Sequence, residues 1–101
     1  MKYYIVTFDR IPGANYKAFH DDFVGHPKIK RWFHYIKSSY IVGTTFSANA
    51  ISDHYAEIAK NHGIPNTHLV MKVVIEDRQG RLTKDAWEWL TKNTPDDDWL
   101  L

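Results

Sequence analysis

Two segments of the chain alternate in the way expected of strands. Residues 2–8 carry apolar side chains on both sides of an extended backbone, which predicts a strand in the centre of a sheet. Residues 69–75 alternate in the same way and predict a second, largely apolar strand. After the first strand, Asp9 begins a loop that Pro12 and Gly13 mark as a turn.

The most aromatic part of the chain covers residues 32–42. Aromatic and β-branched side chains fit the half-buried surface of a sheet, so this block predicts two short strands, 32–37 and 39–45. The strands meet at Ser38 and Ser39, which are predicted to form the bend between them.

Three helices are predicted where apolar residues recur every three or four positions. Asn15, Ser47 and Thr83 are the predicted N-caps, because a short polar side chain can accept a hydrogen bond from the first helical turn. Gly63 and Pro65 end the second helix. The buried stripes are predicted to consist of Tyr16, Phe19 and Phe23, then Ile51, Tyr55, Ile58 and Ala59, and finally Ala86, Trp87 and Leu90.

The predicted order is β-α-β-β-α-β followed by a terminal helix. It predicts an α+β fold, a ferredoxin-like βαββαβ sandwich with an extra C-terminal helix. A chain of 101 residues has room for one core, so a single domain is expected over 1–94, with a C-terminal tail over 95–101. The second face of the sheet needs a cover, either the helix that carries Trp87 and Trp89 or a second copy of the chain. Small two-layer domains often form two-fold dimers, so a homodimer is expected, with these tryptophans at a dimer or partner surface.

Several segments together resemble a known family. They are the strand end Thr7-Phe8-Asp9, the block Trp32–Val42, the segment Ser47–Ile51, the strand Leu69–Val73 and the run Gly80–Leu90. In these segments the chain resembles the small bacterial proteins of the SinR family, which are similar to the CRISPR-associated Cas2 and VapD ferredoxin-like group. The resemblance covers most of residues 2–92 and implies the ferredoxin-like fold.

The resemblance also implies a role for Asp9. Cas2-like proteins place a proposed metal ligand at the end of the first strand, where this chain has Asp9. Two such carboxylates related by a dimer axis could hold one Mg²⁺ ion, which would make the protein a metal-dependent phosphodiesterase or ribonuclease. The alternative is that Asp9 only bonds to the backbone of its own loop.

The block around residue 34 contains two further candidates for catalysis. Ser38 could bind phosphate through its hydroxyl and backbone N–H, or could simply form the bend. His34 could act as a general acid or base near neutral pH, or could be a packed residue with one hydrogen bond. The six histidines show neither HxxxH nor HxH spacing, so no zinc site is predicted.

The charge distribution offers a weaker signal for binding. The chain has 13 basic and 12 acidic residues, and three of the acids are Asp96–Asp98, so the remainder carries 13 − 9 = +4. Lys28, Lys30, Arg31 and Lys37 lie before and within the aromatic block. They predict either a phosphate-facing patch or an ordinary solvated loop.

Tyr40 is a further candidate for contact with a partner. Together with Tyr3 and Tyr35 it could offer a ring on which nucleic-acid bases stack, or these rings could lie in the core. The absence of cysteine excludes a disulfide scaffold and a cysteine nucleophile, and favours the reducing cytoplasm. The apolar runs are too short to span a bilayer, so no membrane association is expected.

Three functions from different classes remain. The sparse polar chemistry favours a small dimeric binding module, non-catalytic, that acts on a protein or nucleic-acid partner and needs no cofactor. The alternatives are the Mg²⁺-dependent nuclease centred on Asp9 and a phage–host conflict protein that inhibits a defence system.

Overall fold

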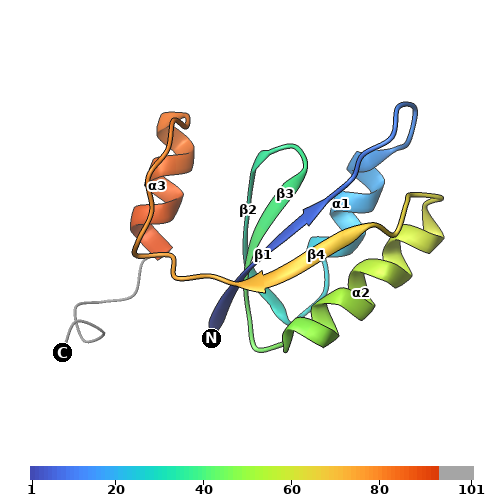
Figure 1. Ribbon diagram of the computed structural model, residues 1–101, viewed down its shortest axis with the longest axis horizontal. Coiled ribbons are helices and arrows are strands. Elements are labelled where there is room, and N and C mark those ends of the chain that lie inside the picture. Colours follow the sequence, from blue (N-terminus) through green and yellow to red (C-terminus); the bar gives the residue numbers. More distant parts are fainter. Residues whose placement is uncertain (94–101) are drawn as a thin grey trace.

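The computed structural model describes residues 1–93, so the tail predicted over 95–101 lies outside the described residues. Four strands and three helices follow one another as β-α-β-β-α-β-α, which confirms the predicted order. Figure 1 shows α1 and α2 together at one side of the sheet and α3 apart from them. The elements are β1 (Lys2–Phe8), α1 (Tyr16–Val24), β2 (Ile29–Ile36), β3 (Ser39–Thr44), α2 (Ala48–Asn61), β4 (His68–Lys72) and α3 (Lys84–Asn93).

The four strands form one antiparallel sheet in the order β2-β3-β1-β4. The predicted central position of β1 is confirmed, since Ile5 pairs with Ile41 of β3 on one side and with Met71 of β4 on the other. The protein is therefore a small α+β domain in which β2 and β4 are the two edge strands of the sheet.

The helix starts follow from the predicted caps. The side chains of Asn15, Ser47 and Thr83 each accept a hydrogen bond from the backbone N–H three residues later, at 3.1, 3.1 and 3.3 Å. The end of α2 is also as predicted, because Gly63 adopts φ = +64°, a conformation that glycine reaches without steric cost.

Two strand boundaries were predicted wrongly by three residues, and the others lie within one residue of the prediction. β2 begins at Ile29 rather than at residue 32, because Ile29 is buried against the helices although charged residues follow it. β4 ends at Lys72 rather than at residue 75. There the chain leaves the sheet, so that Ile75 packs beneath α3 while Val74 is exposed.

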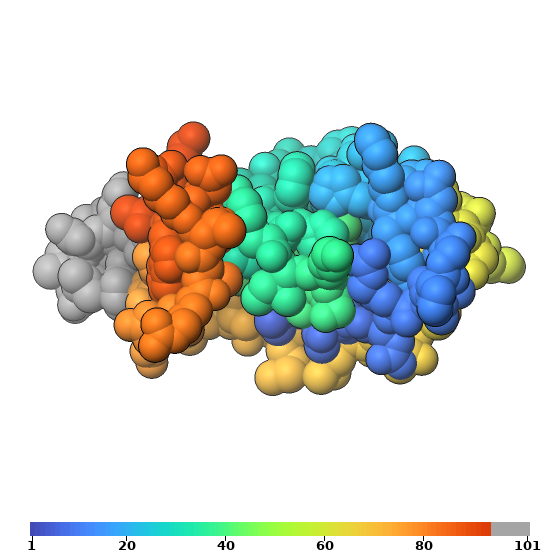
Figure 2. Space-filling view, turned by 90° about the horizontal axis from the view of Figure 1, so that it is seen from above, coloured from blue at the N-terminus to red at the C-terminus, as the bar shows by residue number. Residues whose placement is uncertain are grey.

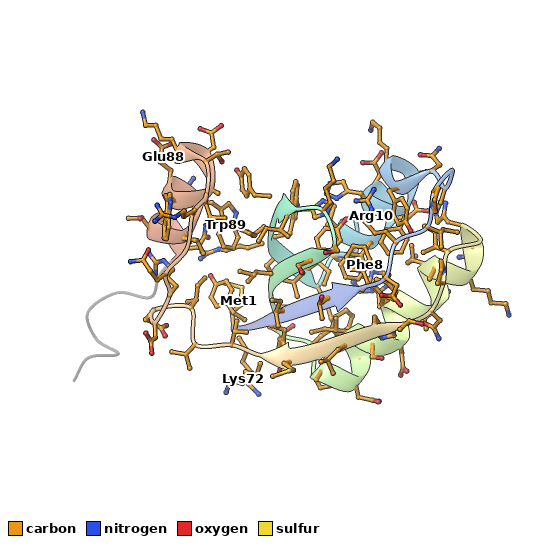
Figure 3. The ribbon with its side chains drawn as sticks, turned by 45° about the horizontal axis from the view of Figure 1, so that its top comes forward. Met1, Phe8, Arg10, Lys72, Glu88 and Trp89 are labelled. Carbon is orange, nitrogen blue, oxygen red and sulfur yellow. The ribbon has the colours of Figure 1, made fainter. Side chains whose placement is uncertain are left out.

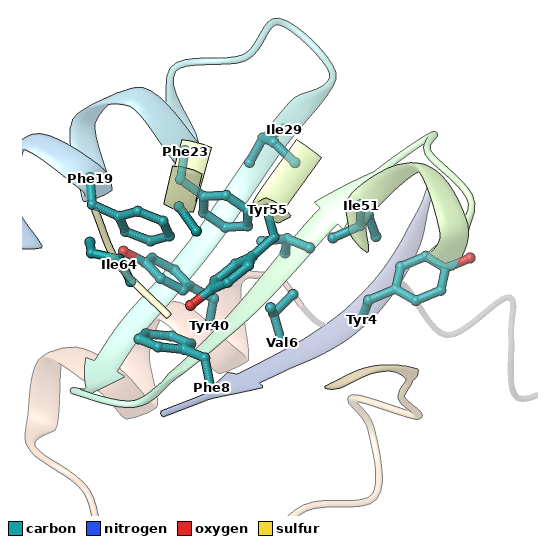
Figure 4. Packing of buried hydrophobic residues seen from close by; sticks show 12 residues of the cluster. Tyr4, Val6, Phe8, Phe19, Phe23, Ile29, Tyr40, Ile51, Tyr55 and Ile64 are labelled. Carbon is teal, nitrogen blue, oxygen red and sulfur yellow. The ribbon is translucent and has the colours of Figure 1, made fainter. Parts of the chain in front are cut away.

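The main core lies between the sheet and the helices α1 and α2. Aromatic side chains dominate it, with the rings of Phe19 and Tyr55 5.2 Å apart and those of Phe8 and Tyr55 5.5 Å apart (Figure 4). Burial of apolar surface of this kind is the main force that stabilises a small domain. The buried members are Tyr4, Val6, Phe8, Phe19, Phe23, Ile29, Tyr40, Val42, Ile51, Tyr55, Ala59 and Ile64.

The second face of the sheet is apolar too, as predicted, but α3 covers only part of it. Tyr3 and Phe33 of the sheet pack there with Ile75 and with Ala86 and Leu90 of α3. Farther along the same face, Leu69 and Met71 of β4 are 54% and 53% exposed. Part of an apolar sheet face therefore lies open.

Candidate functional site

A hollow of about 420 Å³ lies between the edge strand β2 and helix α3. Figure 2 shows α3 lying alongside the strands of the sheet, which reach the surface between α3 and α1. The lining combines cations with broad aromatic rings and contains no acidic residue among those described. It consists of Lys30, Arg31, Trp32, Tyr35, Trp89, Lys92 and Asn93.

A second hollow of about 700 Å³ shares Tyr35 with the first and adds another cation, Arg81, and another indole, Trp87. Its remaining lining residues are Ile36, Gly80, Leu82 and Thr83. Because Tyr35 belongs to both, the two hollows form one depression with Lys30, Arg31 and Lys92 at one end and Arg81 at the other. We refer to this depression as the β2–α3 groove.

Tyr3 of β1 holds two lining residues of the groove, Arg31 and Trp89, in place. Its hydroxyl accepts a hydrogen bond from Nη1 of Arg31 at 3.0 Å, and its ring meets the Trp89 ring edge-on at 6.5 Å between centroids. A Cβ atom at Gly43, the residue paired with Tyr3, would lie 2.9 Å from the Tyr3 ring. Gly43 therefore leaves the space in which the Tyr3 ring lies.

Phe33 contacts Trp89 from a second side, with 5.5 Å between the ring centroids. The Phe33 ring also contacts the Tyr35 ring, at 5.0 Å between centroids. Figure 3 shows Trp89 pointing from α3 toward the strands, whereas the neighbouring Glu88 points away from them. Glu88 forms an ion pair with Lys84 at 3.6 Å on the exposed side of α3. The negative charge of Glu88 is therefore kept out of the groove.

The four bases predicted as a patch fall into two groups. Lys30 and Arg31 line the groove. Lys28 does not, because its ammonium group lies 5.4 Å from the centroid of the Phe46 ring. Lys37 lies in the β2–β3 turn, where its carbonyl accepts a hydrogen bond from Arg10 at 2.9 Å.

Three charged or aromatic residues of the groove, Trp32, Arg81 and Lys92, were not among the predicted binding residues. Trp32 was predicted only as a strand residue and is 41% exposed on β2. Tyr35, which was predicted as a possible stacking ring, is 46% exposed on the same strand. Arg81 and Lys92 come from the far end of the chain. One sequence signal was present: Lys92 follows Trp89 by three positions, so both lie on the same side of α3.

Tyr40, which was predicted as a possible contact for a partner, is a core residue with 1% exposure. Its hydroxyl shares a hydrogen bond of 2.8 Å with Nδ1 of His20, and its ring stacks on that of His34 at 4.0 Å. The His20 ring also meets the Trp32 ring edge-on at 4.7 Å. Tyr40 therefore supports the groove from the core side and offers no ring face to a partner.

Burial sets the charge state of this stack. It lowers the pKa of both His20 and His34, and a hydrogen bond from His34 to the carbonyl of Lys37 opposes the shift only in part. Burial also raises the pKa of the Tyr40 phenol. All three side chains are therefore uncharged at neutral pH.

The other two predicted catalytic residues, Asp9 and Ser38, lie away from the groove. β1 contacts α3 near its start, at Tyr3, whereas Asp9 and Ser38 lie at the other end of this strand. Asp9 is exposed, and its backbone N–H donates to the carbonyl of Thr67 at 3.2 Å. Ser38 forms the turn between β2 and β3, and its carbonyl accepts from the N–H of Phe8 at 3.0 Å. Within residues 1–93, no three His, Cys, Asp or Glu side chains lie close enough to hold a metal ion. A magnesium site at Asp9 would therefore require ligands from a second copy or from a substrate.

No protein-family model matches the chain, and no curated protein or solved structure matches it at a significant level. No helix within residues 1–93 has the length and apolar composition needed to cross a membrane.

Proposed function

We propose that this protein is a non-catalytic binding module for single-stranded nucleic acid, which it holds in the β2–α3 groove. One observation carries the proposal: the described lining brings four cations, Lys30, Arg31, Arg81 and Lys92, together with four large aromatic rings and no carboxylate. Proteins that bind single strands combine these two elements, a cationic path for the phosphates and rings on which the bases stack.

The exposed rings favour a single strand over a duplex. Trp32 and Tyr35 present a large part of their surface to solvent beside the cations. A base can stack on such a ring only when it is not already stacked within a duplex. A protein partner is the competing occupant, and the binding experiment below distinguishes the two.

The arrangement of the sheet supports the finer assignment of the fold. We propose that the order β2-β3-β1-β4, with α1 and α2 against one face, is the ferredoxin-like arrangement shared by the SinR, Cas2 and VapD proteins that the sequence resembles. The open apolar face around Leu69 and Met71 supports a homodimer formed through it. The absence of cysteine supports a cytoplasmic location.

The test is fluorescence anisotropy with labelled single-stranded RNA, single-stranded DNA and duplex DNA at several salt concentrations. We expect single strands to bind more tightly than the duplex. Tyr35→Ala and Trp32→Ala should each cost about 1–3 kcal/mol of binding free energy, as stacking residues do. Lys30→Gln should lower the slope of log K against log salt by about 0.7, the value for one phosphate contact on a single strand.

Lys60→Gln is the matched control, because Lys60 is an exposed lysine at the end of α2, outside the groove. It should leave binding nearly unchanged. Equal losses for Lys60→Gln and Lys30→Gln would show that only the net charge matters. If none of the nucleic acids binds, the proposal is rejected and a protein becomes the favoured partner of the groove.

Magnesium provides a second measurement. Since the proposed binding uses only cations of the chain, we expect EDTA to leave the affinity unchanged and no strand to be cut when Mg²⁺ is added. Cleavage that depends on Mg²⁺ and disappears in Asp9→Ala would replace the non-catalytic proposal by the nuclease hypothesis.

A further inference from the structure

A further cavity of about 350 Å³, continuous with one end of the β2–α3 groove, lies where the chain leaves β4 and returns toward α3. Eight of its thirteen lining residues are apolar. Ile36, Phe33 and Ile41 line it from the sheet, and Val73, Leu82 and Leu90 line it from the connecting segment and α3. It adjoins the Arg81 end of the β2–α3 groove, with which it shares Ile36, Gly80, Arg81 and Leu82.

The polar part of the cavity is confined to the loop 77–81. Arg78 is engaged there, since its Nη1 donates to the carbonyl of Ile75 at 3.0 Å and so fixes the loop. Arg81 also lines the cavity, is exposed, and forms no hydrogen bond or ion pair with residues 1–93. Asp77 is the one carboxylate among the described lining residues, so the rim carries a net positive charge.

We propose that this cavity binds a small carboxylate with an apolar body, such as a medium-chain fatty acid. The hydrocarbon chain would lie between Ile41, Val73 and Leu82, and the carboxylate would lie against the guanidinium of Arg81. The volume falls in the range of small-molecule sites, which are mostly apolar with a few polar groups that fix orientation. Arginine is suited to this role because its planar fork can donate two hydrogen bonds to one carboxylate.

The cavity is suited to such a ligand whether or not the groove binds nucleic acid. Apolar walls would add little binding free energy for phosphates and ribose, and Arg81 would add none for a neutral apolar molecule. A molecule with one anionic end and one apolar end satisfies both parts of the cavity.

The test is calorimetric titration of the full chain with straight-chain carboxylates from hexanoate to palmitate, each below its micelle concentration. We expect the affinity to rise about fourfold for each added methylene until the cavity is full, and then to level off. Arg81→Gln should weaken carboxylates tenfold or more, since a tenfold loss is about 1.4 kcal/mol, while leaving the matching primary alcohols unchanged. Lys60→Gln is again the control and should change neither series.

A second variant tests where the hydrocarbon chain of the ligand lies. Leu82→Ala enlarges the cavity. The affinity of this variant should therefore keep rising to a longer carboxylate before it levels off than the affinity of the unmodified protein does. Circular dichroism checks that the variant remains folded. The proposal is overturned if no carboxylate binds saturably, if alcohols bind as well as carboxylates, or if affinity keeps rising with length in both proteins.

Discussion

The Tyr55 hydroxyl is the least satisfied polar atom of the main core. The side chain is fully buried, and its oxygen has no hydrogen-bond partner among the described residues. The ring nevertheless packs well, since it contacts the rings of both Phe8 and Phe19 (Figure 4). The ring therefore stabilises the core, whereas the hydroxyl costs desolvation energy that no hydrogen bond offsets.

Tyr55→Phe should therefore raise the free energy of unfolding, by about 1 kcal/mol, because it removes only the unpaired hydroxyl. Urea denaturation measures the change. Tyr16→Phe is the matched control: the Tyr16 hydroxyl accepts a hydrogen bond from the N–H of Ile11 at 2.8 Å, so its removal should lower the same free energy by about 1 kcal/mol. Equal destabilisation by both variants would show that the Tyr55 hydroxyl has a partner in solution.

The histidines behind the groove make stability depend on pH. Burial lowers the pKa of His20 and His34 below the ordinary value of 6.5, so the unfolded chain takes up protons first as the pH falls. Lys17 beside His20 and Arg10 beside His34 act in the same direction, and Asp21 opposes the shift at His20.

The free energy of unfolding should therefore be constant with respect to these groups above pH 6.5 and fall below it, until the lowered pKa values are passed. Denaturation midpoints at pH 7.5 and pH 5 measure this fall. His34→Gln removes one of the two groups and should make the fall smaller. An unchanged or larger fall in His34→Gln would assign the pH dependence to other groups.

At the scale of the elements, local chemistry made much of the fold predictable. The three helix starts depend on Asn15, Ser47 and Thr83, whose side chains bond within their own first turns, so no distant contact is needed. The central position of β1 was readable because both of its faces are apolar. β2 was harder to delimit, since Lys30 and Arg31 on an exposed edge strand look like loop residues.

The groove was not predictable from the sequence. Its cations come from β2 and from the α3 region, and Arg31 and Lys92 are separated by most of the chain. They come together only because Trp89 docks on Tyr3, and Tyr3 has room only because its partner in β3 is Gly43. Such a pairing depends on the register of the sheet, which composition does not encode.

At the scale of the whole molecule, the three acids Asp96–Asp98 are expected to weaken the attraction of the groove for phosphate. The formal charge is +1, but Asp96–Asp98 account for three of the twelve acids. These residues follow Lys92 by four to six positions, so chain length alone keeps them within roughly 20 Å of a cation of the groove. At physiological salt the Debye length is about 8 Å, so charges at this separation are largely screened, whereas in dilute buffer of about 0.01 M it is about 30 Å and the charges interact.

Replacing two of these acids should therefore tighten nucleic-acid binding at low salt. For Asp96→Asn/Asp97→Asn we expect affinity for a single strand to rise about threefold in dilute buffer, and by less as salt is added. Asp53→Asn/Glu57→Gln is the matched control, because it adds the same two units of charge on the exposed surface of α2, away from the groove. Anisotropy titrations of both double variants over a salt series measure the difference. If the two variants tighten binding equally, only the total charge matters and the short sequence distance of these acids from Lys92 has no effect of its own.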